Sequence, residues 1–143
     1  MDDDFLPDAA TPFGEKVRRR LREAPIAWLT TVGADGTPQP NPIWFIQEGA
    51  SLLVYNRPDA NRLAHIRRRP RVSFNFDSNG QGGDIVVLTG TAALAEGMPL
   101  PHELPEYVQK YSQRMQRVSN SLEEFSRQYP VALRISELRV RGF

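Results

Sequence analysis

The sequence predicts a mainly β fold, an antiparallel β-barrel with peripheral helices, in one domain that spans residues 1–143. Three observations favour this class. Six segments have the composition or the alternation of strands, short helical segments separate them, and a helical insert at 103–129 precedes the last strand. With 143 residues and 40% apolar content, the chain is long enough for one core and too short for two.

The first predicted elements are a helix over residues 12–23 and a β-hairpin. Thr11 is typical of a helix N-cap, and Pro12 suits the first helical position. Apolar residues then recur at four-residue spacing. Strands at Ile26–Val32 and Thr37–Ile46 flank a glycine-rich turn, which predicts the hairpin.

Three prolines alternate in the second strand of this hairpin, at Pro38, Pro40 and Pro42. Residues two apart in a strand direct their backbone N–H groups the same way, so the missing donors fall on one edge. We expect that edge to face solvent or a ligand and not another strand. A flat aromatic ligand could lie along Asn41 to Trp44, although a core role explains the aromatic residues that end this strand equally well.

Strands and short helices alternate after the hairpin. The predicted elements are a strand at 52–55, a helix at 58–69, strands at 72–77 and 84–95, two helices within 103–129 and a strand at 131–140. In the long strand at 84–95, Gly90 marks a bulge. Apolar residues change parity near Glu137 in the last strand, which predicts a bend or bulge there as well.

Composition excludes several classes of site. The chain has no cysteine and only two histidines, His65 and His102, so we predict no disulfide and no metal site. No glycine-rich phosphate loop and no Gly-x-Ser-x-Gly elbow occurs, so motifs predict no catalytic side chain. An acidic start and the lack of a long apolar run argue against a secretory signal and a membrane helix, and we expect a cytoplasmic protein.

The positive charge is almost entirely arginine, because lysine occurs only at Lys16 and Lys110. Arginine clusters at residues 18–22 and at residues 62–71. Its fixed charge and planar donor fork suit phosphate or carboxylate, although solvated helix faces would explain both clusters. No nucleic-acid-binding motif accompanies the charge, which disfavours a nucleic-acid partner.

The densest polar constellation is Tyr55-Asn56-Arg57-Pro58-Asp59-Ala60-Asn61-Arg62, which leaves a predicted strand and enters a predicted helix. Backbone N–H groups at the helix start, amide side chains and guanidinium groups can converge there on one anion. The segment therefore predicts a phosphate site. Helix capping at an ordinary strand-to-helix turn would collect similar residues.

Taken together, these segments resemble the split-barrel flavin and deazaflavin oxidoreductases related to pyridoxamine phosphate oxidase. The resemblance covers roughly Pro25–Glu96. It rests on the motifs PNPIWF (residues 40–45), LVYNR (53–57), NR (61–62), RPRVSF (69–74) and LTGTA (88–92). Within the family the chain is most similar to short actinobacterial members assigned to the deazaflavin coenzyme F420. The fold that this implies is a six-stranded antiparallel split β-barrel of the FMN-binding type.

The resemblance also implies a cofactor and a site. Coenzyme F420, or FMN as the alternative, would bind at a homodimer interface, with Arg62 on its phosphate and the ring system along residues 41–44. The implied cofactor-binding residues are Asn41, Pro42, Ile43, Trp44, Tyr55, Asn56, Arg57, Asn61 and Arg62. The partner chain could add contacts from Gln81 or from the tail near Arg141. Ala60 stands where some members carry a second basic residue.

The implied activity is hydride transfer from reduced F420 to a small conjugated acceptor such as a quinone or an enone. Since the cofactor supplies that chemistry, no side-chain acid, metal or nucleophile is required. The exposed arginines at residues 67–71 would favour the polyglutamate tail of F420 over the shorter FMN. An FMN-dependent oxidase or reductase of the same fold, and a binding module without turnover, remain as alternatives.

Overall fold

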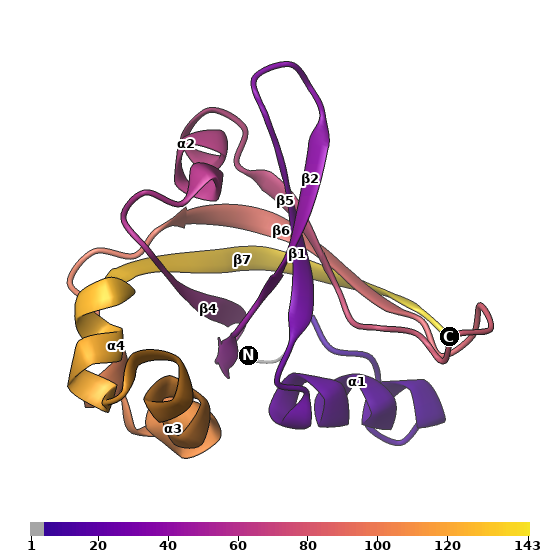
Figure 1. The fold of residues 1–143 in the computed structure, drawn as a ribbon. Helices are drawn as coiled ribbons and strands as arrows, with labels where there is room; N and C mark the ends of the chain where they lie inside the picture. Colours follow the sequence, from indigo (N-terminus) through magenta and orange to yellow (C-terminus); the bar gives the residue numbers. More distant parts are fainter. Residues whose placement is uncertain (1–4) are drawn as a thin grey trace.

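A curled antiparallel sheet forms the body of the protein (Figure 1). The computed structural model describes residues 5–143, and within them the sheet has seven strands in the order β2-β1-β5-β6-β7-β4-β3. The strands are β1 (Ala27–Val32), β2 (Pro38–Ile43), β3 (Ile46–Glu48), β4 (Ser51–Asn56), β5 (Arg71–Asn75), β6 (Val86–Leu94) and β7 (Val131–Gly142). All neighbouring pairs are antiparallel, which confirms the predicted class.

The two edge strands of this sheet, β2 and β3, follow one another directly in the chain. Only Trp44 and Phe45 separate them. Three peptide steps of 3.8 Å span at most about 11 Å, so the sheet must curl until its two edges lie close together. The result is a split barrel, closed at this point by the covalent chain and not by a hydrogen-bonded ladder.

The prediction of one strand over Thr37–Ile46 is therefore wrong, and the sheet has seven strands instead of six. The physical reason lies in a helix far along the chain, α3 (Pro105–Ser119). The Phe45 N–H donates to the Tyr111 hydroxyl at 3.0 Å, and the Phe45 carbonyl accepts from Lys110 Nζ at 3.0 Å. Side chains of α3 thus satisfy the Phe45 backbone groups that a continuing strand would pair.

The Tyr111 hydroxyl ties three segments together. It accepts from Phe45 and donates to the Pro25 carbonyl at 2.8 Å, and the tyrosine is fully buried. Burial raises the pKa of Tyr111 well above its usual value, so the hydroxyl keeps its proton. Lys110 Nζ also lies 3.8 Å from the centre of the Phe45 ring, and burial lowers the pKa of Lys110 to about 8.

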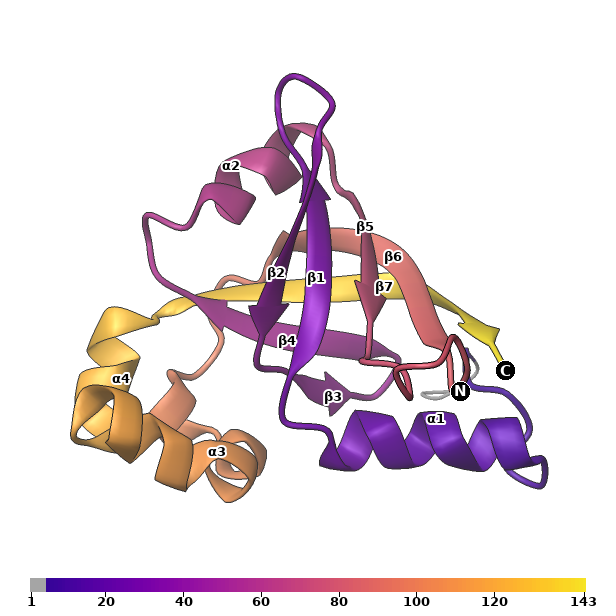
Figure 2. The ribbon, with the colours of Figure 1, turned by 45° about the vertical axis from the view of Figure 1, so that its right-hand side comes forward.

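Four α-helices surround the barrel among residues 5–143: α1 (Pro12–Glu23), α2 (Asn61–Arg68), α3 and α4 (Leu122–Gln128), with a 3₁₀ turn, η1, at Pro101–Glu103. As predicted, the Thr11 side chain caps α1 by accepting from the Gly14 N–H at 3.0 Å. α2 is shorter than expected because Ala60 has an extended backbone. Figures 1 and 2 show α1 beneath the barrel, α2 toward the opposite end, and α3 with α4 at one side. None of these described helices has the length and apolar character to cross a membrane.

Strand β4 is buried on both of its faces. Leu52 and Val54 point into the barrel core, whereas Leu53 and Tyr55 pack against α3 and α4 in a second apolar cluster. A strand covered on both sides reads as a continuous apolar run, which is why the sequence shows no alternation there. The helical insert therefore covers the outer face of β4 and β7.

The bulge predicted at Gly90 and Glu137 is present. Pairing passes from Thr89 opposite Arg139 to Thr91 opposite Ser136, so β7 carries one extra residue across from Gly90. Glu137 adopts a φ of 54° there. A Cβ on Gly90 would lie 2.7 Å from the Ser136 carbonyl oxygen, so a larger residue would not fit without a shift. The bulge bends the longest pair of strands around the barrel.

The proline edge also lies where the pattern predicts it. The Gly33 N–H donates to the Thr37 carbonyl at 3.0 Å, which starts the alternation of bonded and non-bonded pairs between β1 and β2. The backbone nitrogens of three prolines consequently point away from β1, toward the free edge of the sheet: those of Pro38, Pro40 and Pro42. That edge offers carbonyl acceptors without the donors that another strand would need.

Replacing Tyr111 with phenylalanine should lower the free energy of unfolding by about 1 to 3 kcal/mol, because it leaves the buried Phe45 N–H without an acceptor. Denaturant-induced unfolding measures this. Tyr107→Phe is the matched control on the same helix, since no residue from 5 to 143 hydrogen-bonds the Tyr107 hydroxyl, and its stability should stay within about 0.5 kcal/mol of wild type. Equal losses in the two variants would contradict a specific role for Tyr111.

Candidate functional site

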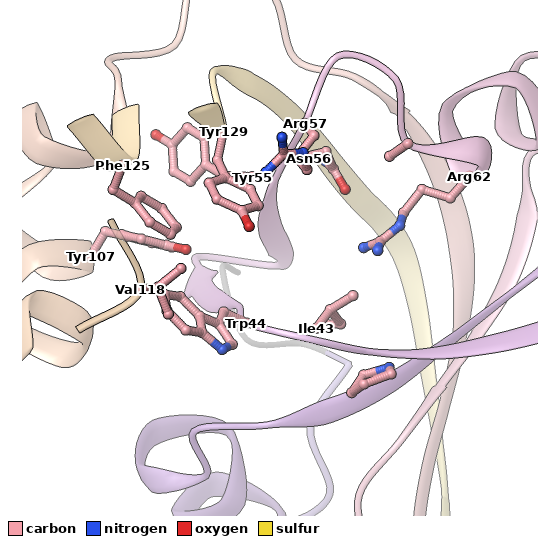
Figure 3. A pocket seen from close by; sticks show the side chains of 12 residues that line it. Ile43, Trp44, Tyr55, Asn56, Arg57, Arg62, Tyr107, Val118, Phe125 and Tyr129 are labelled. Carbon is pink, nitrogen blue, oxygen red and sulfur yellow. The ribbon is translucent and has the colours of Figure 1, made fainter. Parts of the chain in front are cut away.

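A cavity of about 350 Å³ opens where β2 ends, β4 ends and α2 begins, with α3 and α4 as its far wall (Figure 3). Its volume falls in the range of roughly 300 to 1,000 Å³ that small-molecule sites occupy. The residues that line it are Pro42, Ile43, Trp44, Tyr55, Asn56, Arg57, Ala60, Arg62, Tyr107, Val118, Phe125 and Tyr129. One side of the cavity is polar and the other is aromatic.

Arg62 forms the charged part of the polar side. It projects from the first turn of α2 into the cavity (Figure 3), and no residue within 5–143 gives its guanidinium an ion pair or a hydrogen bond. Burial lowers the pKa of Arg62, which reflects the cost of holding this charge away from water. Ala60 caps α2 without a side-chain acceptor, and of the first-turn N–H groups only that of Leu63 is bonded within the described chain, to the Ala60 carbonyl, so those of Asn61 and Arg62 stay available. An anion at the start of α2 would contact both the Arg62 guanidinium and these N–H groups.

Asn56, at the end of β4, is almost fully buried in the same wall. Its Nδ2 donates to the Val54 and Val131 carbonyls, both at 3.0 Å. These two hydrogen bonds fix the orientation of the amide, because the flipped amide would place Oδ1 against two carbonyl oxygens. Both donors are used inside the protein, and Oδ1 is left without a partner among the described residues. The unused polar atom of Asn56 is thus a buried acceptor, where the sequence suggested an amide donor for an anion.

The aromatic side consists of rings that stack on one another. Trp44 stacks with Tyr111 at a centroid distance of 4.9 Å and with Phe125 at 5.3 Å, and Phe125 stacks with Tyr129 at 4.4 Å. The Arg57 guanidinium lies 5.4 Å from the centre of the Tyr129 ring. The protein's own rings hold the indole of Trp44 in place, so the wall is formed before any ligand arrives.

Two tyrosines of the cavity differ in what their hydroxyls do. Tyr55 donates to the Pro99 carbonyl at 2.6 Å, and burial raises its pKa to about 12. The Tyr107 hydroxyl points toward the cavity (Figure 3), and no protein group among residues 5–143 bonds it. Burial raises the pKa of Tyr107 well above its usual value, so this hydroxyl stays protonated and can donate to a ligand.

The structure brings most of the candidate residues to this cavity and leaves two outside it. Pro42, Ile43, Trp44, Tyr55, Asn56, Arg57 and Arg62 line it, whereas Asn41 and Asn61 are exposed and do not. Arg57 lies at the rim, where its side chain is 54% exposed and 3.8 Å from Asp59.

Sequence reasoning missed the wall that the insert provides. Tyr107 and Val118 lie on α3, and Phe125 and Tyr129 are four residues apart. Such spacing indicates one helical face. The spacing does not show that this helical face packs over the end of β4.

Other titratable groups serve the fold. His65 Nδ1 lies 2.8 Å from the Thr31 hydroxyl, and His102 Nδ1 lies 2.7 Å from the Ser126 hydroxyl. Within the described part of the chain, no group of three potential metal ligands occurs. In the arginine cluster of α1, Arg19, Arg20 and Arg22 pair with Glu15, Asp84 and Glu23. These pairings leave little free positive charge on α1.

Substituting Arg62 by methionine should raise the free energy of unfolding of the ligand-free protein by roughly 0.5 to 1 kcal/mol. The aliphatic stem is kept while an unpaired, partly buried charge is removed. Thermal or denaturant unfolding without added anions measures the change. Arg57→Met is the control, since that exposed group should shift stability by less than about 0.5 kcal/mol. A destabilised Arg62→Met variant would show that Arg62 supports the fold.

Comparison with known proteins places this architecture. The family model described as pyridoxamine 5′-phosphate oxidase matches residues 13–141. No curated protein matches the chain by sequence. Several solved structures share the fold. A putative pyridoxamine 5′-phosphate oxidase from Listeria innocua has 19% sequence identity and a TM-score of 0.62, over 90% of this chain and 98% of that one. The heme storage protein HutZ from Vibrio cholerae has 19% identity and a TM-score of 0.58, over 90% and 94% of the two chains, and an F420 reductase has 17% identity and a TM-score of 0.54, over 86% and 94%. By the extent of the family match and by its split barrel, the chain belongs to the pyridoxamine 5′-phosphate oxidase family.

Proposed function

We propose that this protein is an oxidoreductase that binds coenzyme F420 and transfers a hydride to a small conjugated acceptor. The observation that carries the proposal is a preformed cavity with an unpartnered arginine on one side and a stacked aromatic wall on the other. A ligand that fits it combines an anionic group with a flat apolar ring system. Flavins and deazaflavins have both parts.

The residues present fit such a cofactor. Arg62 and the first turn of α2 would hold the phosphate, and Pro42, Ile43 and Trp44 would border the ring system. The cavity of about 350 Å³ is near the lower end of the usual range, so a long tail would extend outside it.

Exposed arginines favour F420 over FMN as the cofactor. Arg67, Arg68 and Arg71 are exposed at the end of α2 and the start of β5. Their charge would attract a polyglutamate tail, which FMN lacks. Arg69 contributes less, because its Nε donates to the Val32 carbonyl at 2.8 Å. An FMN-dependent enzyme of the same fold would use the same cavity and remains the alternative.

Haem is a poorer fit, although one structural neighbour is a heme storage protein. Among the described residues, the side chains that line the cavity include no histidine, cysteine or methionine, the usual axial ligands of haem iron. Tyrosine can ligate haem iron as the phenolate, but burial raises the pKa of Tyr55 and Tyr107, two of the three tyrosines that line the cavity, and so disfavours that form in both.

The reduced cofactor supplies the hydride when it is bound, and the acceptor also takes up one proton in becoming, for example, a hydroquinone. The chain's own contribution is positioning. The Tyr107 hydroxyl can donate a hydrogen bond to a carbonyl oxygen on which negative charge develops. Trp44 and Phe125 exclude water beside it and match a flat acceptor.

The proposal includes a homodimer whose two copies meet through sheet faces. Among residues 5–143, no helix covers the face of β1, β2 and β5 that is turned toward the viewer in Figure 2. Trp28 and Pro42 are cross-strand partners and so point to the same side of the sheet, and Pro42 also lines the cavity. A partner on that side would reach the site. The proline edge prevents the alternative in which two sheets join strand to strand.

Fluorescence titration of the apoprotein with oxidised F420 and, in parallel, with FMN should give tighter binding of F420, with an affinity that falls as salt rises. Arg62→Ala should weaken binding by about 1 to 3 kcal/mol through loss of a charge-assisted contact. Arg127→Ala is the matched control, because Arg127 pairs with Glu124 on the exposed side of α4. Tighter, salt-independent FMN binding would favour the FMN alternative, and binding of neither cofactor would refute the proposal.

Turnover separates an enzyme from a binding module. With reduced cofactor and a quinone, Tyr107→Phe should lower kcat by about 10²-fold or more, the usual effect of removing one donor to a developing oxyanion, while cofactor affinity changes less than twofold. Tyr55→Phe controls for the loss of a phenol, since that hydroxyl is bound to Pro99. Tight cofactor binding without oxidation by any quinone or enone would indicate a module that has no catalytic role.

A further inference from the structure

We propose that Asn56 is a specificity-determining residue, whose Oδ1 accepts a hydrogen bond from a hydroxyl of the chain that links the ligand's ring system to its phosphate. This inference rests on the proposed function and deepens it. It predicts a feature of the ligand that neither Arg62 nor the aromatic wall requires, namely a donor placed close to the anionic group.

Asn56 Oδ1 has no hydrogen-bond donor within the part of the protein that the structure describes. The oxygen is buried, and no donor among residues 5–143 reaches it. The amide cannot flip to relieve this, because both hydrogens of Nδ2 are committed to the Val54 and Val131 carbonyls. A buried acceptor without a partner is costly, and native proteins rarely keep one without a reason.

The location of this oxygen favours a ligand as the missing donor. Asn56 belongs to the cavity wall, and Figure 3 shows its side-chain oxygen on the same side as Arg62, away from Phe125 and Tyr107. Oδ1 is closed to solvent in the ligand-free protein, so a ligand atom would reach it only after side chains of the cavity wall shift. Arg62, which has no ion pair or hydrogen bond among residues 5–143, can move without breaking one.

An acceptor such as Oδ1 restricts the chemistry of its partner. An ionised phosphate group carries only acceptor oxygens, so it suits the Arg62 guanidinium and is repelled by Oδ1. The group that meets Asn56 must carry an O–H or N–H donor. A polyol chain ending in phosphate provides hydroxyls next to the anion, and the ribityl chain shared by FMN and F420 is such a chain. Carboxylate-bearing ligands without hydroxyls would satisfy Arg62 and leave Oδ1 unpaired.

The test combines a change in the protein with a change in the ligand and measures binding affinity for each combination. The ligands are the ribityl form of whichever cofactor the wild-type protein binds more tightly, and an analogue in which a plain pentyl chain carries the phosphate. Each is titrated into wild type, Asn56→Leu and Asn61→Leu. Asn61 is the matched control, because it carries the same side chain at the exposed start of α2, outside the cavity lining.

Wild type and Asn61→Leu should bind the hydroxyl-free analogue roughly tenfold more weakly than the ribityl cofactor, whereas Asn56→Leu should bind the two equally. Asn56→Ala serves if the leucine variant does not fold, since it also removes the acceptor and leaves room for water beside the two carbonyls. An unchanged ribityl preference in the Asn56 variant would overturn the inference and leave the proposed function standing. Failure of wild type to bind either cofactor would overturn both.

Discussion

The fold depends on the two-residue link between its edge strands. Trp44 and Phe45 join β2 to β3, and so oblige a seven-stranded sheet to curl until its first and last strands lie together. The link cannot use a sheet ladder, because the chain changes direction within it. Tyr111 and Lys110 supply the missing backbone partners from α3. One hydroxyl and one ammonium group thus secure the point at which the barrel is split.

The same link positions the functional site. Trp44 faces the cavity while its neighbour Phe45 is fully buried in the barrel core, so closure of the barrel and formation of the site share two adjacent residues. The helical insert likewise contributes one residue to closure of the barrel and a neighbouring one to the site. In α3, Tyr111 holds the link and Tyr107, one turn earlier, reaches the cavity. Stability and ligand binding are therefore expected to be coupled through α3.

The polar side of the cavity is organised at a cost to the ligand-free protein. Arg62 is a cation without a counter-ion, and Asn56 Oδ1 is an acceptor without a donor, each within the described chain. Both groups lower the stability of the empty protein. Binding sites commonly carry such unsatisfied groups, because a ligand that pairs them recovers the lost free energy. The poverty of catalytic motifs in the sequence is consistent with a site built for binding and orientation.

Local patterns in the sequence determined much of this protein. Alternation, capping residues and proline or glycine positions predicted the strands, the first helix, the free edge of β2 and the bulge at Gly90, because each depends on a few neighbouring residues. They also placed Arg62 at a helix start. Only the tertiary structure decided the break at Trp44, the aromatic wall from α4 and the burial of Asn56 Oδ1 without a donor among the described residues. Each of these rests on a contact between distant segments, such as Phe45 with Tyr111 at a separation of 66 residues, and periodicity carries no information about such contacts.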